Sequence, residues 1–458
     1  MKYYLIKTLG CKANLYDSNR IESELQAKGW MPKGQFEIDP DAEVLCIINS
    51  CTVTDEADRQ SRKLATKLRR DYPRAQVVLT GCAAEVNPEL LSKEPGVHAL
   101  VVSNREKHLI VERILAKISG PSAGSHPAFS DKTWEADAPF AKIQTGVLKN
   151  HTRTFLKIQE GCNSFCTYCI IPYGRGTARS LAPQEVIAQI NTLVDAGTKE
   201  IILTGTNLGE YGHDSSDPSS LEDLVKRILG DTQLPRLRVS SLDPKEVTPG
   251  LVRMMIDDSR FCPHFHISLQ HTEDRILRLM KRKYRFKEVS ECFDRIASIP
   301  ALHFGQAGVF VGMDYITGFP QESEKEFQAS YQTLEALPWT RLHVFPYSER
   351  QGTAATRLPH PVPKPERIKR ARLLGTLSLR RLNAFYENTL SLPRIRNVLF
   401  EQPGRDGRGG GHTPNYLHVI VENVDVSGRR NTIGDVIPLR LETHPSSGEV
   451  SLIAKIVD

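Results

Sequence analysis

The chain has 458 residues, of which 40% are hydrophobic and 25% charged, a composition typical of a globular protein with two or three domains. Lys and Arg number 60 and Asp and Glu 54, so a net charge of +6 leaves only local basic patches to attract an anionic partner. No stretch approaches the roughly 20 apolar residues of a membrane span, and Lys7 interrupts the short apolar start. We therefore expect a cytoplasmic protein with no signal peptide and no contact with a membrane.

The first segment, residues 1–120, alternates strand and helix patterns. Strands are expected at 3–8, 44–49, 76–80 and 99–103, of which 44–49 and 76–80 read as buried, with helices at 15–28 and 56–71. This alternation predicts an α/β domain whose parallel sheet is covered on both faces. Residues 121–150 follow as a linker, because the stretch is rich in Pro, Gly, Ser and Ala and has no periodicity.

The second segment, residues 151–386, repeats a strand–helix step six times. Its expected strands are 155–159, 200–204, 237–241, 264–269, 309–317 and 341–347. Six steps favour a partial (β/α)6 barrel, whose sites lie at the carboxyl ends of the strands. Residues 391–458 change to short alternating strands between Gly- and Pro-rich turns, which predicts a small β-barrel.

Three cysteines, Cys162, Cys166 and Cys169, follow the first strand of the second segment with the spacing C-x3-C-x2-C. Thiolates this close can hold three irons of a [4Fe–4S] cube and leave the fourth iron open. S-adenosylmethionine could chelate that iron, and one electron would then split its sulfonium to a 5′-deoxyadenosyl radical. The alternative is a structural zinc site, but zinc usually takes four ligands and no fourth lies nearby.

Polar or glycine-rich tips recur where the other strands of this barrel end. Gly205, Asn207, Ser240 and Gln270 are the positions we expect to bind S-adenosylmethionine. Taken singly, such a Ser or Asn more often caps a helix than binds a ligand. Their recurrence at successive strand ends favours the binding role.

A second set of cysteines, Cys11, Cys51 and Cys82, follows three successive strands of the first segment. The ends of parallel strands converge on one edge of a sheet, so these thiols are expected to meet and hold a second cluster. The alternative is three ordinary buried cysteines. The chain has nine cysteines in all, and Cys46, Cys262 and Cys292 are expected to be buried structural thiols.

Several stretches resemble the radical SAM methylthiotransferases over nearly the whole chain. Residues 8–14, 49–54 and 80–83 resemble the three cysteine motifs of that family, 160–176 its radical SAM motif and 411–416 its TRAM domain. Within the family, 8–14, 262–270 and 342–348 are most similar to bacterial enzymes that modify N6-threonylcarbamoyladenosine in tRNA. One departure follows Gln270, where His271-Thr272 replaces the usual small residue and glycine.

The resemblance implies methylthiolation at C2 of that adenosine, next to the anticodon. It also implies two [4Fe–4S] clusters, one on each cysteine set, and S-adenosylmethionine. The expected partners are the tRNA anticodon stem-loop, a reducing electron donor such as flavodoxin or ferredoxin, and a sulfur source. Two other readings remain open: the same chemistry on isopentenyladenosine or a ribosomal-protein aspartate, and an iron–sulfur RNA-binding protein without catalysis.

A basic run before the small β-barrel is a candidate RNA contact. Its members are Lys364, Arg367, Lys369, Arg370, Arg372, Arg380 and Arg381. Clustered cations on one helix can bind phosphates. A solvated helix face explains the same run equally well.

Overall fold

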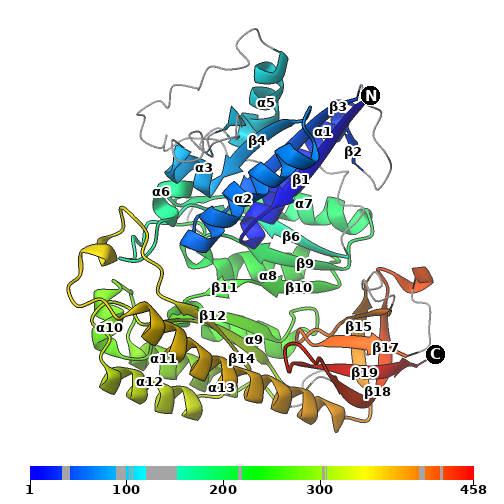
Figure 1. The fold of residues 1–458 in the computed structure, drawn as a ribbon. Coiled ribbons are helices and arrows are strands. Elements are labelled where there is room, and N and C mark those ends of the chain that lie inside the picture. Colours follow the sequence, from blue (N-terminus) through cyan, green and yellow to red (C-terminus); the bar gives the residue numbers. More distant parts are fainter. Residues whose placement is uncertain are drawn as a thin grey trace.

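The computed structural model describes residues 1–33, 42–88, 100–102, 104, 107–119, 152–214, 219–301, 305, 307–401, 408–422 and 427–457. These residues form a parallel-sheet region, a barrel and a small β-barrel, in chain order (Figure 1). The α/β fold class is thereby confirmed, while the predicted linker at 121–150 lies outside the described residues. Within the described ranges, no helix has both the length and the apolar character that crossing a membrane requires.

The N-terminal region is a five-stranded parallel sheet in the order β2-β1-β3-β4-β5. Its elements are β1 (Lys2–Thr8), α1 (Lys12–Ala27), β2 (Met31–Pro32), β3 (Glu43–Ser50), α2 (Asp55–Asp71), β4 (Gln76–Gly81), α3 (Cys82–Val86), β5 (Leu100–Val101), η1 (Lys107–Leu109) and α5 (Ile110–Ser119). Thr54 caps α2 by accepting a hydrogen bond from the Ala57 N–H, and acidic residues fill the first turn of this helix.

Both faces of this sheet are covered, as the apolar strand patterns predict. Cys46 and Ile48 of β3 pack on the α2 side with Leu68, whereas Ile47 packs on the opposite side with Ile21 of α1 and helix α5. Successive residues of a strand point to opposite faces, so an unbroken apolar run indicates burial on both. The polar chemistry of this region is consequently confined to the ends of its strands.

The central region forms six strand positions in two adjoining parallel sheets, in the orders β10-β9-β6 and β11-β12-β13-β14. Its strands are β6 (Arg153–Lys157), β7 (Gln159–Glu160), β8 (Arg179–Ser180), β9 (Glu200–Thr204), β10 (Arg236–Val239), β11 (Ser241–Leu242), β12 (His264–Gln270), β13 (Phe310–Thr317) and β14 (Arg341–Pro346). Its helices are α6 (Ile171–Arg175), α7 (Pro183–Asp195), η2 (Leu208–Glu210), α8 (Leu221–Asp231), η3 (Pro244–Glu246), α9 (Pro249–Asp257), α10 (Asp274–Leu279), α11 (Phe286–Ala297), α12 (Glu324–Ala336), η4 (Ala354–Arg357) and α13 (Lys364–Leu390). The strand expected at 237–241 is divided into β10 and β11 at Ser240, whose N–H donates to the Leu203 carbonyl on β9.

The C-terminal region is a closed β-barrel in the order β15-β16-β17-β19-β18. Its elements are β15 (Ile395–Phe400), β16 (Gly410–His412), β17 (His418–Val421), η5 (Ser427–Arg429), β18 (Ile433–Thr443) and β19 (Val450–Ile456). Phe310 at the start of β13 and Leu382 of α13 belong to the same hydrophobic core as this barrel.

Polar contacts also fasten the small barrel to the central region. Arg236 donates to the His412 carbonyl at 3.0 Å, and Arg341 pairs with Glu449 at 2.6 Å. The Tyr386 hydroxyl on α13 accepts from the His418 N–H at 3.1 Å. The long helix α13 therefore joins the two regions as one packed body (Figure 1).

Candidate active site

The structure brings Cys11, Cys51 and Cys82 to one edge of the N-terminal sheet. Parallel pairing aligns Asn49 of β3 with both Thr8 of β1 and Thr80 of β4, so the three strands end side by side. Cys11 then caps α1, Cys51 directly follows β3, and Cys82 begins α3. The three positions therefore share one edge, as their places after successive strands predict.

Gly10 permits this close approach. Its φ is +91°, and a Cβ at this position would lie 2.6 Å from both Cβ and Sγ of Cys51. Only glycine adopts that backbone without strain, and any side chain would displace the neighbouring thiol. The glycine before Cys11 is thus a requirement of the cysteine set itself.

Two asparagines hold the strand ends in place. The Asn14 side chain donates to the carbonyls of Leu9 and Ser50, at 2.7 and 2.9 Å. The Asn49 amide donates to the carbonyl of Asn14 at 2.7 Å. These bonds tie the first turn of α1 to the chain after β1 and to the end of β3. Both asparagines lie inside the cysteine motifs, although the pattern alone does not reveal their positioning role.

Cys162, Cys166 and Cys169 lie in one loop after β7, held by local hydrogen bonds. The Cys162 N–H donates to the Gly176 carbonyl and the Cys169 N–H to the Cys166 carbonyl, both at 3.0 Å. Asn207 donates its amide toward Cys162 Sγ at 3.7 Å. Arg282 donates to Cys166 Sγ at 3.2 Å and pairs with Asp243, a contact between distant segments that no sequence motif indicates.

The surroundings of four of these thiols, Cys51, Cys82, Cys162 and Cys169, favour the protonated form. Burial, with neighbouring sulfurs as a smaller cause, raises the pKa of Cys51 and of Cys169 to about 12. Burial likewise raises the pKa of Cys82 and of Cys162. Iron binds thiolates, so loading either set would release protons.

Each set offers three thiols, the number that a [4Fe–4S] cluster with one open iron would take. Among the described residues, no three Cys, His, Asp or Glu side chains are placed to share one metal ion. In a [4Fe–4S] cube each cysteine binds a different iron, so its ligands need not converge on one point. Cys46, Cys262 and Cys292 are fully buried, as expected for structural thiols.

The four positions predicted for S-adenosylmethionine lie at strand ends but do not all meet. Gly205 and Ser240 line a cavity of about 750 Å³, and Asn207 lines a neighbouring one of about 520 Å³. Gln270 ends β12 at a φ of +59° and lines neither. After it, His271 is buried and hydrogen-bonded to Glu322 at 3.0 Å, so the departure from the family pattern has a packing role here.

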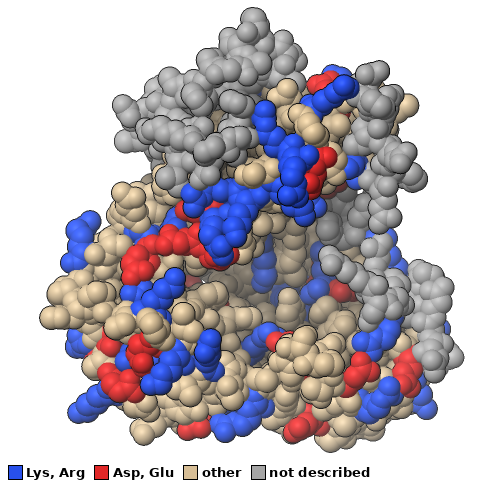
Figure 2. All heavy atoms as spheres, in the orientation of Figure 1, with Lys and Arg blue, Asp and Glu red and all other residues tan. Residues whose placement is uncertain are grey.

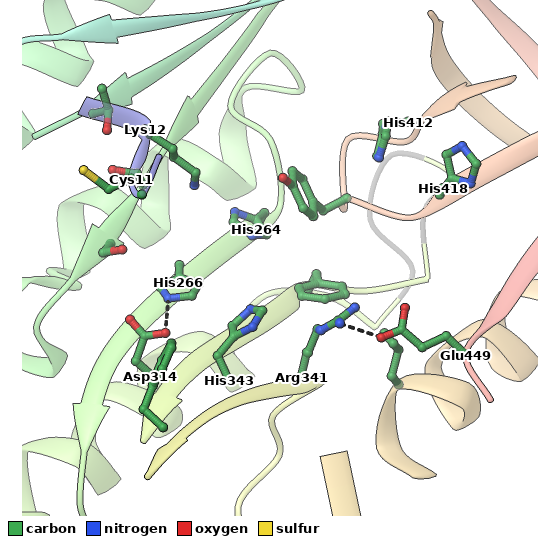
Figure 3. A pocket seen from close by; sticks show the side chains of 18 of the residues that line it. Cys11, Lys12, His264, His266, Asp314, Arg341, His343, His412, His418 and Glu449 are labelled. Atoms are coloured by element: carbon green, nitrogen blue, oxygen red, sulfur yellow. Dashed lines mark hydrogen bonds and ion pairs between the residues drawn. The ribbon is translucent and has the colours of Figure 1, made fainter. Parts of the chain in front are cut away.

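The larger cavity lies where the three regions meet (Figure 3). Cys11 and Lys12 form part of its wall, and His412 and His418 of the small β-barrel form another part. Its volume exceeds what one nucleobase fills and falls in the range of ordinary ligand sites. The central barrel is therefore open on the side that faces both the first cysteine set and the small β-barrel.

Polar side chains from neighbouring strands face this cavity. His266 of β12 lies 3.0 Å from Asp314 of β13, and the rings of His266 and His343 are 5.4 Å apart. Burial lowers the pKa of His343 and of Lys12. Sequence reasoning did not identify these residues, although the alternation of polar and apolar residues in 264–270 indicates one polar face on β12.

A buried ionic network joins the first region to the barrel beside the cysteines. Lys157 of β6 pairs with Asp17 of α1 at 2.5 Å, and Arg175 pairs with Glu160 at 2.6 Å. Lys107 contacts both carboxylates. Burial opposes ionisation of Asp17, but Lys107 and Lys157 hold its pKa below the ordinary value. The network thus fixes the relative position of the two cysteine sets.

The comparisons with known proteins agree with this geometry. Residues 3–103 match the uncharacterized protein family UPF0004 and residues 156–334 the radical SAM superfamily. The chain is 35% identical to a threonylcarbamoyladenosine tRNA methylthiotransferase of Aquifex aeolicus, over 86% of this chain and 92% of that one. A Bacillus subtilis protein of the same name is 33% identical, over 95% and 92%. A tRNA-2-methylthio-N(6)-dimethylallyladenosine synthase of Syntrophobacter fumaroxidans is 29% identical, over 98% and 96%.

Among solved structures, the radical S-adenosylmethionine methyltransferase TsrM of Kitasatospora setae is similar in fold, with a TM-score of 0.54 and 13% identity over 75% of this chain and 73% of that one. The predicted radical SAM chemistry is confirmed by the family match, and with it an iron–sulfur cluster and S-adenosylmethionine as cofactors. The extent and identity of the curated matches show that the chain belongs to the radical SAM methylthiotransferase family.

Proposed function

We propose that the protein methylthiolates C2 of N6-threonylcarbamoyladenosine beside the anticodon of tRNA, and that each cysteine set holds a [4Fe–4S] cluster. The observation that carries the proposal is the position of the larger cavity. Its wall includes Cys11 of the first set and also Gly205, two residues before Asn207, whose amide lies 3.7 Å from Cys162 Sγ. A base in this cavity would thus lie between the two cysteine sets.

The chemistry requires both sets. The C2–H bond of adenine is not acidic enough for an ordinary base, so the cluster at Cys162, Cys166 and Cys169 would supply the radical and the other would carry the sulfur. The chain's own residues enclose the base and orient it between the two sites. The relatives named for threonylcarbamoyladenosine support the choice of substrate.

A basic face on α2 supports an RNA partner. Arg59, Lys63 and Lys67 recur four residues apart along this helix, which begins just after Cys51, and all three are exposed. Arg59 is paired with Glu56, so Lys63 and Lys67 carry most of the argument. Figure 2 shows Lys and Arg gathered over α2, above a hollow in the surface. We propose that this face binds phosphates of the tRNA stem. A tRNA substrate would also place the protein in the cytoplasm.

The basic run on α13 is a weaker candidate than its sequence indicates. Arg367 and Arg370 are buried; Arg367 pairs with Glu349, and Arg370 with Glu322 and Glu324. Arg380 pairs with Glu335 at 3.0 Å. Carboxylates of the same chain therefore neutralise much of the charge that RNA would need.

The decisive experiment is expression of the full chain in a bacterium that lacks its own tRNA methylthiotransferases, followed by mass spectrometry of tRNA nucleosides. We expect 2-methylthio-N6-threonylcarbamoyladenosine, and none from the Cys166→Ala variant. A methylthio group on isopentenyladenosine would keep the chemistry and reject the proposed substrate. A chain that holds both clusters but yields no new nucleoside would reject tRNA as the target and direct the search to a protein aspartate.

A further inference from the structure

Lys12 occupies an unusual place in the cavity wall. It is the first residue of α1 and follows Cys11 directly. In Figure 3 the sulfur of Cys11 points away from the centre of the cavity, whereas the Lys12 side chain extends into it toward His264 and His266. One backbone turn thus presents a cluster ligand on one side and a cation on the other.

The other cations around the cavity already have carboxylate partners. Arg341 pairs with Glu449 at 2.6 Å, and Arg238 pairs with Glu200 at 3.0 Å. The nearby carboxylate of Asp314 is itself engaged by His266 at 3.0 Å. Among the described residues, Lys12 forms no hydrogen bond or ion pair, and the nearby groups that favour its charged form are Tyr416 and Asp314. An ammonium in a partly buried wall without an acceptor is costly, and an anion from the substrate would offset that cost.

The chemistry of the proposed substrate supplies such an anion at a suitable place. On adenine, C2 and the N6 substituent lie along the same edge of the ring, on either side of N1. A base with C2 toward the cysteine sets therefore keeps its N6 substituent near the same part of the wall, whose lining includes Lys12, His266 and His343. A threonylcarbamoyl group ends in a carboxylate and a hydroxyl, whereas a dimethylallyl group is wholly apolar.

We propose that the Lys12 ammonium binds the carboxylate of the threonylcarbamoyl group, with the imidazoles of His266 and His343 beside it. This inference rests on the proposed function and adds the residue that selects its substrate. An apolar N6 substituent would leave Lys12 without a partner, so the same contact rejects isopentenyladenosine. Lys12 is a specificity residue and takes no part in the radical chemistry.

The test compares binding of synthetic anticodon stem-loops by the cluster-loaded full chain. The loops carry threonylcarbamoyladenosine, its methyl ester or unmodified adenosine at the same position. For the wild type we expect the acid to bind on the order of ten- to a hundred-fold more tightly than the ester, as for a charge-assisted hydrogen bond. Because the ester changes only the substrate, this arm needs no variant that folds. Equal affinity for acid and ester would overturn the proposal.

Variants of the lysine give the second arm. Lys12→Gln should lose the preference for the acid and bind unmodified adenosine as the wild type does, whereas Lys12→Arg should retain most of the preference. Lys7→Met, an exposed lysine on β1, is the matched control and should behave as the wild type. Iron content and cleavage of S-adenosylmethionine without RNA should equal the wild type for Lys7→Met, and the same two measurements on the Lys12 variants show whether their clusters are loaded.

The outcomes separate this inference from the proposed function. A wild type that makes the methylthiolated product, with a Lys12→Gln variant that loses affinity equally for all three loops, would show that Lys12 binds the RNA backbone and would overturn the inference alone. A wild type that neither binds the acid-bearing loop nor modifies it would reject the proposed function as well.

Discussion

The two cysteine sets of this protein are assembled in different ways. Cys162, Cys166 and Cys169 lie in one loop, which its own backbone hydrogen bonds hold. Cys11 and Cys82 are far apart in the sequence and reach Cys51 only because β1, β3 and β4 pair in parallel. The loop set is therefore a local structure, whereas the sheet-edge set depends on strand register over the whole first region. Local changes should damage them unequally.

The largest effect is expected from Cys166→Ala in the loop set. If Cys166 is one of three ligands of the cluster that cleaves S-adenosylmethionine, as proposed, its removal should reduce formation of 5′-deoxyadenosine to background. Chromatography of the reaction mixture measures this product. The sheet-edge cluster should remain, so iron content should fall by about four per chain, not to zero. Retained cleavage would show that the loop does not hold the radical-forming cluster.

Cys51→Ala should have the converse phenotype. Cleavage of S-adenosylmethionine should persist, while the methylthiolated nucleoside disappears, because the sulfur-carrying site would be lost. Cys46→Ala is the matched control, since Cys46 lies on the same strand but is buried in the core. It should keep full iron content and product at a stability cost of about 1 kcal/mol. Normal product from Cys51→Ala would remove the sheet-edge set from the reaction.

Asp17→Asn tests whether the buried ionic network holds the two cysteine sets in a fixed relative position. The substitution removes the carboxylate that pairs with the buried Lys157 ammonium. We expect this loss to destabilise the protein by about 3–5 kcal/mol. The pKa of Asp17 is lowered in the folded state, so its stabilisation is present above the ordinary carboxyl pKa and is lost as pH falls toward the folded value. Denaturant titration between neutral and acidic pH should show a larger loss of stability in the wild type than in the variant, which keeps the lowered pKa of Glu160.

The exposed pair Asp231 and Arg227, 3.9 Å apart, provides the control for that experiment. Asp231→Asn should cost at most about 1 kcal/mol, because solvent screens an exposed ion pair. Equal costs for the two substitutions would mean that the buried network does not stabilise the contact between the regions.

The smallest effect is expected from substitutions on α2, which begins shortly after Cys51 but contributes no residue to either cysteine set. Lys63→Ala with Lys67→Ala should weaken tRNA binding and lower the slope of log affinity against log salt by about 2, while cleavage without RNA stays unchanged. Lys226→Ala with Lys325→Ala, on exposed positions of α8 and α12, is the control and should leave the slope unchanged. An unaltered slope for the α2 pair would place the RNA elsewhere.

Sequence patterns predicted the elements well where burial is uniform. The apolar runs of β3 and β4 indicated a covered parallel sheet, and six strand–helix steps indicated the partial barrel. They also placed Cys11, Cys51 and Cys82 at one edge, because the ends of parallel strands converge. The break at Ser240 was missed, since a continuous polar-apolar pattern does not show where a strand changes sheet.

Contacts between regions were beyond prediction. Lys12, Asp314 and His343 are distant in the sequence and carry no common motif, yet they face one cavity. The ion pairs of the basic run on α13 could not be predicted either. Glu322 pairs with Arg370 and Glu349 with Arg367, and no local sequence pattern indicates these contacts. A run of basic residues forms a basic surface only where the fold does not pair these residues with carboxylates.

The attachment of the small β-barrel has a consequence for how a base enters. Its core is shared with α13, and Arg236 and Arg341 bond it to the central strands. These contacts oppose movement of the small β-barrel against the central region. We therefore expect the cavity to be preformed and not to close around its ligand. For the proposed substrate, the distortion needed to reach the cavity would fall on the RNA, because a nucleotide in an unpaired loop can turn outward at a cost of a few kcal/mol. A nucleotide held in a rigid duplex could not enter the cavity, so duplex RNA would be excluded by its shape whatever its base sequence.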